Sequence, residues 1–353
     1  MERNYREIVL TGGPCSGKTT AKSWLTRYFG EQGIRVLQPD EIATQVISSG
    51  LDDFMTRDDS VFQAVESTIL DLHLTTRNSY RKIAEAFAPE PVLIVYDRAE
   101  GDLRSYVGDD YWDCLAKKHG LDGGFQSYSY DTVIHLVSAA TGAEEHYTLE
   151  NNSARRESIE EAALRDKRTL ECWLGHPNLK IIDNSTDFAG KMERLIDQVK
   201  PLFLIDEPSS YRRLYLLGSP PNIADLPAPV VSIKIKETLT NDQPPAWLTS
   251  WDCAGQIAYF LDRDKGGIAT ASIISPHEYD ALADSDENVR RRQIDRQRWC
   301  FHHNGRLCRI DLIEPFSEWV LSVDLESETE LFVPPENMLL SEFDESHLYT
   351  RAI

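Results

Sequence analysis

The first two hundred residues alternate short, continuously apolar runs with amphipathic segments. One such run, Val92–Tyr96, predicts a strand that is buried on both faces, and five runs predict β-strands in all. They are Glu7–Leu10, Ile34–Leu37, Val92–Tyr96, Thr132–Val137 and Leu179–Ile182.

The segments between these runs carry apolar residues at helical spacing, such as the stripe formed by Phe62, Val65, Ile69 and Leu72. Further helices are expected at Ala21–Phe29, Tyr111–Lys118, Ser158–Trp173 and Phe188–Val199. Strands that alternate with helices predict an α/β fold with a parallel sheet covered on both faces. We expect this domain to span residues 1–200.

The pattern changes after about Lys200. The segment Pro201–Ser210 contains two prolines and predicts a linker, and short strands punctuated by Pro and Gly follow it. The strand candidates are Arg213–Leu217, Val230–Thr238, Gln256–Leu261, Ile268–Ile274, Trp299–His303, Leu307–Leu312 and Trp319–Leu325. They predict a mostly antiparallel β domain over residues 209–335, either a barrel or a curled sheet, followed by an acidic tail at 336–353.

A glycine-rich segment joins the first predicted strand to the first predicted helix. Gly12–Thr19 satisfies the pattern Gly-x-x-x-x-Gly-Lys-[Ser/Thr] in the context that a phosphate-binding loop requires. Its backbone amides and the helix N-terminus attract phosphate, Lys18 reaches the outer phosphates, and the Thr19 hydroxyl can ligate Mg²⁺. The alternative is a turn that only caps a helix. We expect ATP or GTP to be bound by Gly13, Ser16, Gly17, Lys18, Thr19 and Thr20.

A second magnesium ligand is expected where a buried strand ends. Val92–Tyr96 is followed directly by Asp97 and Arg98, with Asp102 shortly after them. Open parallel sheets bind ligands at this edge, so Asp97 is the candidate metal ligand and a candidate catalytic residue. A turn with surface ion pairs is the alternative for both aspartates.

Two further sets of residues are candidates for catalysis. Asp40 and Glu41 follow the second strand, and Glu41 is a candidate general base, whereas Asp40 fits a helix N-cap equally well. Arg155 and Arg156 could close over a transferred phosphoryl group as part of a lid. Alternatively, they lie on a solvated helix face and pair with nearby glutamates.

The overall charge restricts the partners. The chain has 58 acidic and 37 basic residues and a formal net charge of -21, which repels duplex nucleic acid and anionic membranes. No apolar run approaches the roughly 20 residues of a transmembrane helix. The six cysteines show no zinc-binding spacing. We expect a cytoplasmic protein that is not transmembrane and contains reduced thiols.

Several stretches together resemble the family that joins an AAA-type, nucleoside-kinase-like P-loop NTPase domain to a CYTH-like domain. In the first domain they are Leu10–Cys15, Gly17–Thr20, Glu41–Thr44, Asp97, Arg98, Asp102, Asp131–Ala140, Ala154–Glu157, Trp173–Pro177 and Ile182–Ser185. The resemblance implies an NTPase similar to nucleoside and nicotinamide riboside kinases, with ATP or GTP as ligand and phosphoinositide binding as a family theme. It implies no particular phosphoryl acceptor.

The resemblance continues into the second domain, where it implies a triphosphate-tunnel fold. It rests on Ser275–Tyr279, on Ile294, Arg296, Arg298, Cys300 and Phe301, and on Ile310 and Asp311, which are similar to later strands of that fold. The glutamates that coordinate metal in such tunnels are missing. Ser232–Glu237 stands in place of Glu-x-Glu-x-Lys, and Ser322–Asp324 in place of the closing Glu-x-Glu.

Basic residues nevertheless remain in the second domain. Strand alternation places Lys234 and Lys236 on one face, and Arg296 and Arg298 on the face of Ile294. Buried arginines are costly without anions, so these four residues predict a pocket for a phosphorylated small molecule or a phosphoinositide head group. Arg290, Arg291 and Arg292 fit a solvated basic turn slightly better.

Three functions are compatible with these features. The first is a regulatory protein whose NTPase domain is coupled to a phosphate-ligand pocket in the second domain. The second is a small-molecule kinase that uses Asp40 or Glu41 as base. The third is an active triphosphatase in the second domain, which ranks last because the paired glutamates are absent.

Overall fold

The chain is represented by a computed structural model. It describes residues 3–51, 53–119, 121, 129–146, 158–205, 211–240, 246–262, 271–283, 293–314, 316–325, 327, 329–336 and 338–343. The chain divides into two compact units, and the main change from the first to the second falls between Val199 and Lys200. The short segment Leu174–Asn178 also belongs to the second unit.

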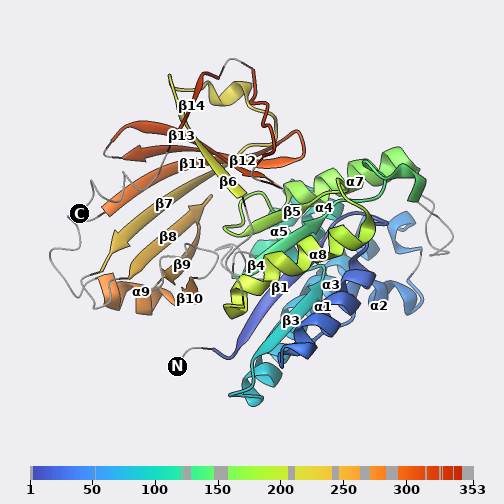
Figure 1. The fold of residues 1–353 in the computed structure, drawn as a ribbon. Helices are drawn as coiled ribbons and strands as arrows, with labels where there is room; N and C mark the ends of the chain where they lie inside the picture. The colour runs from blue at the N-terminus through green and yellow to red at the C-terminus, as the bar shows by residue number, and fades with distance from the viewer. Residues whose placement is uncertain are drawn as a thin grey trace. The chain divides into compact units, whose positions relative to one another are not determined.

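The first unit contains a five-stranded parallel sheet with the strand order β2-β3-β1-β4-β5 (Figure 1). The strands are β1 (Tyr5–Thr11), β2 (Arg35–Leu37), β3 (Val92–Asp97), β4 (Thr132–Leu136) and β5 (Leu179–Ile182). Strand β1 is central, and its residues Ile8, Val9 and Leu10 are inaccessible to solvent. Strands β1 and β3 in the middle of the sheet are therefore covered on both faces, whereas the edge strand β2 is partly exposed.

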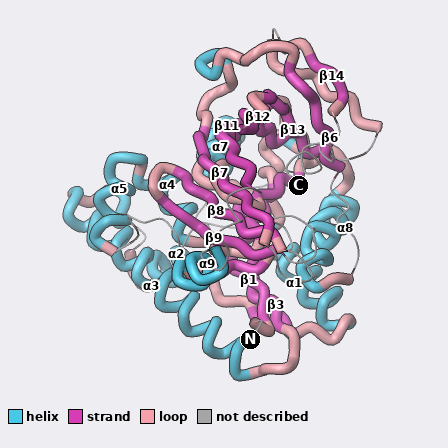
Figure 2. The backbone as a smooth tube through the Cα atoms, turned by 90° about the vertical axis from the view of Figure 1, so that its left-hand side faces the viewer, coloured by secondary structure: helices cyan, strands magenta, loops and turns pink. Residues whose placement is uncertain are grey.

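Helices supply this cover. They are α1 (Lys18–Glu31), α2 (Ile42–Ser48), α3 (Asp59–Ala86), α4 (Glu100–Val107), α5 (Asp109–Lys118), α7 (Ile159–Glu171) and α8 (Phe188–Val199). Figure 2 shows α3, α4 and α5 on one side of β1 and β3, with α1 and α8 on the other. The predicted α/β fold of this part is confirmed.

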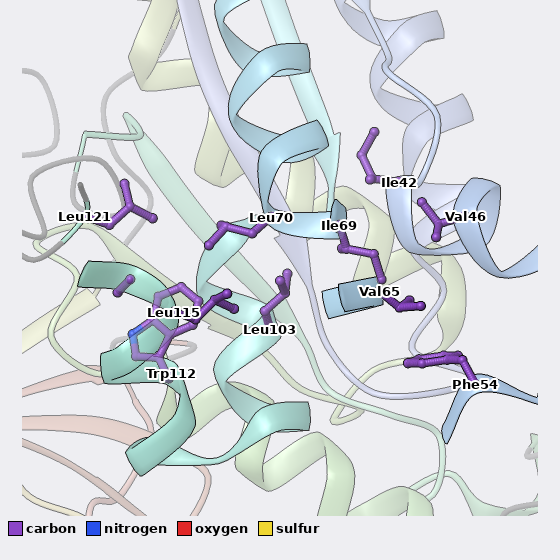
Figure 3. Close-up of a cluster of buried hydrophobic side chains, with 11 residues drawn as sticks. Ile42, Val46, Phe54, Val65, Ile69, Leu70, Leu103, Trp112, Leu115 and Leu121 are labelled. Carbon is purple, nitrogen blue, oxygen red and sulfur yellow. The ribbon is translucent and has the colours of Figure 1, made fainter. Parts of the chain in front are cut away.

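Helix α4 was not anticipated, and α2 was indicated only by the candidate N-cap Asp40, because neither helix has a long apolar stripe. Helix α2 has only seven residues, and the first turn of α4 buries the polar side chains of Glu100 and Asp102. Both helices are held by a cluster of buried apolar side chains that α3 and α5 share (Figure 3). The cluster consists of Ile42, Val46, Phe54, Val65, Ile69, Leu70, Leu103, Trp112, Leu115, Ala116 and Leu121.

A close approach of two elements makes Gly101 in α4 essential for packing. A Cβ at this position would lie 2.6 Å and 2.7 Å from ring atoms of Trp173, whose side chain is 2% exposed. We expect Gly101→Ala to lower the free energy of unfolding by about 1–3 kcal/mol through overpacking. Gly30→Ala is the control, because a Cβ on this α1 residue meets no atom within 4 Å and should be neutral or stabilising. Urea unfolding of both variants tests the prediction, and equal stabilities would contradict it.

The second unit contains a nine-stranded sheet in which the paired strands are antiparallel. The strands are β6 (Tyr211–Leu217), β7 (Val231–Leu239), β8 (Trp247–Cys253), β9 (Gln256–Asp262), β10 (Ser272–Ile274), β11 (Gln293–His303), β12 (Arg306–Glu314), β13 (Glu318–Leu325) and β14 (Leu340–Glu342). In the part of the chain that the structure describes, the order runs β10-β9-β8-β7-β11-β12-β13-β6-β14. The predicted, mostly antiparallel β fold is confirmed.

Three elements differ from the expectations. Strands β8 and β14 were not predicted, and Ser275–Tyr279 does not form a strand, because Pro276–Ala283 is the helix α9. The reason is a capping box: the Ser275 amide donates to Glu278 Oε2 at 2.8 Å, and the Glu278 amide donates to Ser275 Oγ at 3.2 Å. A proline at the first helical position completes this N-terminal signal.

The segment Leu174–Asn178 is fixed within the second unit by Trp251 of β8. The indole Nε1 of Trp251 donates a hydrogen bond to the Gly175 carbonyl oxygen at 3.1 Å, and this side chain is 1% exposed. The chain therefore enters the second unit after Trp173 and returns to the first at Leu179.

Candidate functional site

The glycine-rich loop follows the central strand β1 at the carboxyl edge of the parallel sheet. Two of its glycines have backbone conformations that other residues rarely adopt: φ is 132° at Gly12 and 92° at Gly17. A Cβ at Gly12 would lie 2.2 Å from the Leu136 carbonyl oxygen, and one at Gly17 would lie 2.8 Å from the Phe188 ring. The loop therefore requires glycine at both positions.

Residues from β4 and α7 hold this loop in place. The Gly13 amide donates to Asp166 Oδ1 at 2.6 Å, and His135 Nε2 lies 3.3 Å from the same oxygen. The Ala139 amide donates to the Cys15 carbonyl oxygen at 3.2 Å. Burial alone would raise the pKa of Asp166, but His135 and the Gly13 amide lower it below its usual value. Asp166 thus supports the loop as a carboxylate.

Sequence reasoning did not identify Asp166 as part of the site. Its only signal is a polar residue among the buried positions of α7, which include Ala162, Thr169 and Leu170. Such a position predicts a buried partner, but the partner is more than 150 residues away in the sequence. Nothing local identifies it.

Lys18 is the first residue of α1, and its side chain folds back onto the loop. The ammonium donates to the carbonyl oxygens of Gly12 at 2.8 Å and Gly13 at 3.0 Å, and to Ser16 Oγ at 3.0 Å. Removal from solvent is the main reason that its pKa is lowered to about 8. Thr19 and Thr20 are exposed at the helix N-terminus. The loop thus combines a cation with the positive end of a helix, an arrangement that stabilises a bound anion.

Asp97 is the last residue of β3 and pairs in register with Leu10 of β1, next to the loop. Lys22 Nζ lies 3.7 Å from Asp97 Oδ2, whereas Oδ1 is buried and has no hydrogen-bond partner among the described residues. Burial raises the pKa of Asp97, and Lys18 and Lys22 oppose this shift. A buried carboxylate oxygen without a partner is a suitable ligand for Mg²⁺.

Lys22 was also missed, although it has a signal. It follows Lys18 by four residues and therefore lies on the same face of α1, one turn further along. Its ammonium forms an ion pair with Asp97 Oδ2 at 3.7 Å.

Glu41 is held by an arginine that follows Asp97. Arg98 Nε lies 3.0 Å from Glu41 Oε1, and the Thr44 hydroxyl donates to Glu41 Oε2 at 2.7 Å. Burial would raise the pKa of Glu41, but Arg98 and Thr44 lower it below its usual value, which makes Glu41 a weaker base in this arrangement. The suggested N-cap role of Asp40 is wrong. Asp40 is exposed, and Glu41 occupies the N-cap position of α2 without a side-chain capping bond.

Both carboxylate oxygens of Asp102 accept hydrogen bonds from groups of the fold. Its Oδ1 accepts a hydrogen bond from the Thr11 hydroxyl, and its Oδ2 accepts one from the Ala99 amide at 2.9 Å. The residue is 1% exposed. Asp102 therefore fixes the start of α4 to the end of β1.

The structure describes some of the arginines that the sequence analysis singled out but not others. Arg155 and Arg156, the lid candidates, lie outside the described residues, as do Arg290, Arg291 and Arg292. Arg165 of α7 donates a hydrogen bond from Nη1 to the Ser105 carbonyl oxygen at 3.2 Å. Its guanidinium also lies 4.6 Å from the centre of the Tyr106 ring. Arg165 therefore connects α7 to α4.

The sequence model of the AAA domain family matches residues 7–191, which is just over half of the 353-residue chain. The chain belongs to the AAA domain family. The match begins in β1 and includes the glycine-rich loop, Asp97 and Asp166. This AAA domain therefore contains the whole of the candidate site described above.

Solved structures are similar to parts of the AAA domain protein. The hypothetical protein NE1496 is 15% identical with a TM-score of 0.27, and 37% of this chain matches 86% of that one. The inorganic triphosphatase NE1496 is 14% identical with a TM-score of 0.27, with 37% and 83% covered. PH1819 from Pyrococcus horikoshii OT3 is 13% identical with a TM-score of 0.24, with 34% and 80% covered. TM-scores this low carry no inference about this chain.

No curated protein matches the sequence of the AAA domain protein. In the described ranges, none of its helices is long and apolar enough to cross a membrane.

The second unit of the AAA domain protein contains a hollow of about 500 Å³ on one face of its sheet. Lys234 and Lys236 of β7 line it, and strand pairing places Gln297 and Asp295 of β11 directly opposite them. Arg296 and Arg298 alternate with these two residues. Arg298 does not line the hollow, so the prediction that all four basic side chains share one pocket is wrong. Arg296 borders the hollow, although strand alternation directs its side chain to the other face of the sheet, where it pairs with Glu237.

The two arginines are neutralised by carboxylates of their own sheet. Arg296 is 5% exposed, and its Nε lies 2.7 Å from Glu237 Oε2. Arg298 forms two hydrogen bonds of 2.7 Å to Asp311. Burial would raise the pKa of Asp311, but Arg298 lowers it below its usual value. The burial of these arginines therefore does not require a phosphate ligand, contrary to our expectation.

Proposed function

We propose that the first unit binds ATP or GTP together with Mg²⁺ and that nucleotide binding is coupled to a phosphate-ligand pocket in the second unit. The loop residues Gly13, Ser16, Gly17, Lys18, Thr19 and Thr20 hold the phosphates. Thr19 and Asp97 hold the metal, directly or through water. The observation that carries this proposal is the buried Asp97 oxygen without a hydrogen-bond partner, beside a loop that presents Lys18 and a helix N-terminus.

Each side chain has a defined task in this proposal. Lys18 exchanges its three hydrogen bonds within the loop for contacts with the outer phosphates, so its ammonium has acceptors in both states but is neutralised only by the phosphates. Asp166 keeps the loop in shape, because it holds the Gly13 amide. When bound, Mg²⁺ neutralises charge on the outer phosphates. Arg155 and Arg156 would close over the nucleotide as a lid.

Replacing Asp97 with asparagine tests the metal site. Asp97→Asn keeps the size of the side chain but removes the charge that attracts Mg²⁺. We expect the affinity for ATP or GTP to fall about tenfold with Mg²⁺ present and less than twofold with EDTA. Isothermal titration calorimetry measures both values. Asp110→Asn, an exposed carboxylate at the start of α5, is the control. Equal losses with and without Mg²⁺ would assign Asp97 a structural role.

A small-molecule kinase is the second candidate, and the position of Glu41 favours it. Glu41 lies close enough to influence the Lys18 ammonium electrostatically and is held by Arg98 next to Asp97. In a kinase, Glu41 would accept the proton of an acceptor hydroxyl once Arg98 releases it. Turnover of ATP or GTP with and without nucleosides separates the two candidates, because only a kinase gains turnover from an acceptor.

A further inference from the structure

The hollow in the second unit is built by two rows of side chains that cross five strands. Register places Tyr259, Ser250, Lys236, Asp295 and Glu314 in one row. The second row consists of Ile257, Asp252, Lys234, Gln297 and Leu312. Both rows run from β9 through β8, β7 and β11 to β12, so the lysines lie in the middle and the carboxylates flank them. We call this surface the Lys234–Lys236 hollow.

The opposite charges in this hollow face each other without forming ion pairs. Lys234 is opposite Asp252 and Lys236 is opposite Asp295, an arrangement in which neighbouring side chains normally interact. Within the described ranges, neither lysine has a carboxylate oxygen within 4.0 Å. Charges of both signs are therefore available to a ligand.

Among the residues that the structure describes, the carboxylates of Asp252 and Asp295 have local hydrogen-bond partners. Asp252 accepts a hydrogen bond from the Gly255 amide at 2.8 Å, and Asp295 accepts one from the Gln293 side chain at 2.6 Å. Neither partner carries a positive charge. The negative charge of both groups therefore remains unneutralised.

This charge pattern disfavours a ligand that is only anionic. A triphosphate would meet two ammonium groups but also the carboxylates of Asp252, Asp295 and Glu314. In the described part of the chain, no group of three or more His, Cys, Asp or Glu side chains is placed to hold a metal ion that would offset them. A purely cationic ligand would be repelled by the lysines. A ligand that carries both a negative and a positive group can pair with the lysines and with the carboxylates.

The lining also includes Arg296, whose charge is paired with Glu237, and several apolar and aromatic side chains. Ile257 and Leu312 end the second row, and Tyr259 packs against Tyr279 of α9 with ring centroids 4.5 Å apart. A volume of about 500 Å³ is typical of small-molecule sites. A ring in the ligand could pack against these apolar and aromatic side chains.

We propose that the Lys234–Lys236 hollow binds a zwitterionic phosphate ester, a small phosphorylated compound that also carries a protonated amine and a ring. Its phosphate lies on Lys234 and Lys236, and its amine lies on the flanking carboxylates. Adjacent strands are about 5 Å apart, so a short linker between the two charges is sufficient. This inference rests on the ligand-binding role proposed for the second unit and deepens it, and the ligand does not require nucleotide at the loop in order to bind.

Calorimetry on the full chain tests the proposal with pyridoxamine 5′-phosphate, which combines a ring, an amine and a phosphate. Pyridoxine 5′-phosphate lacks the amine, pyridoxamine lacks the phosphate, and tripolyphosphate is only anionic. We expect pyridoxamine 5′-phosphate to bind at least tenfold more tightly than each of these three. Equal binding of pyridoxine 5′-phosphate, tighter binding of tripolyphosphate, or no binding of pyridoxamine 5′-phosphate would overturn the proposal.

Variants of residues in the hollow and in the loop determine where pyridoxamine 5′-phosphate binds. Lys236→Gln and Asp295→Asn should each weaken pyridoxamine 5′-phosphate at least fivefold, and the exposed Lys82→Gln in α3 should leave it unchanged. Loss of probe binding in Lys18→Ala but not in Lys236→Gln would place the probe at the loop and refute the hollow. ATP and GTP affinities of Lys236→Gln and Asp295→Asn are measured in parallel and should be unchanged. Failure at the hollow is thus distinguishable from failure of the proposed nucleotide site.

Discussion

Lys18→Ala is expected to weaken the binding of ATP or GTP by roughly 100-fold without unfolding the first unit. The ammonium is the charged donor of the loop, whose other donors are mostly backbone amides. A hydrogen bond to a charged group contributes about 1.5–3 kcal/mol, and 1.4 kcal/mol corresponds to tenfold in affinity. The fold should tolerate the change, because burial already disfavours the charged form of this lysine.

Isothermal titration calorimetry at fixed salt and Mg²⁺ measures this loss. Lys167→Ala is the control, since Lys167 in α7 is 62% exposed and pairs with Glu171 one turn away. It should retain the affinity of the unmodified chain. An unchanged nucleotide affinity for Lys18→Ala would refute the assignment of the loop.

Arg77→Met is expected to destabilise the first unit by about 3–5 kcal/mol at pH 7. Arg77 in α3 is 2% exposed and lies 3.3 Å from both Glu7 and Glu100, each of which is fully buried. Its guanidinium lies 3.5 Å from the centre of the Tyr130 ring. Removing it leaves two buried carboxylates with too little compensating charge, which is the costly case for a buried ion network.

The loss of stability in Arg77→Met should depend on pH, and the pKa of Glu7 determines whether it grows or shrinks as the pH falls. Burial would raise the pKa of Glu7, but Arg77 and Arg81 lower it to about 2 in the folded state, compared with about 4.5 in the unfolded chain. The contribution of Glu7 to stability is therefore complete above pH 4.5 and is lost as the pH falls towards 2. Without Arg77, Glu7 protonates more easily, so the variant should lose less stability at pH 4 than at pH 7.

Urea unfolding at both pH values measures this difference. Arg57→Met is the control, because Arg57 and Asp53 form an ion pair whose side chains are 60% and 50% exposed. We expect it to change stability by less than about 0.5 kcal/mol. A loss below 1 kcal/mol for Arg77→Met at pH 7 would show that the network is not needed for folding.

The strands and the loop of the first unit were predictable because their signals are local. Gly12–Thr19 contains its own pattern, and Asp97 follows a continuous apolar run that ends at a known edge of the sheet. Asp166 was not predictable, because its partner Gly13 lies on a distant part of the chain.

The second unit shows the same limit. Alternation correctly predicted that Arg296 and Arg298 share a face with the buried Ile294, but it could not supply their partners. Glu237 and Asp311 become partners through the pairing of β11 with β7 and β12. The sequence of one strand does not encode the register with its neighbours.

The hydrogen bond between Trp251 and Gly175 limits how this protein could have arisen by recombination. A single crossover near residue 200 would join the later strands to a foreign N-terminal partner and would omit Leu174–Asn178. The buried indole N–H would then lose its acceptor, at a cost of about 1–3 kcal/mol. The two units are therefore expected to be inherited together, and a homologue that lacks the first should also have replaced Trp251.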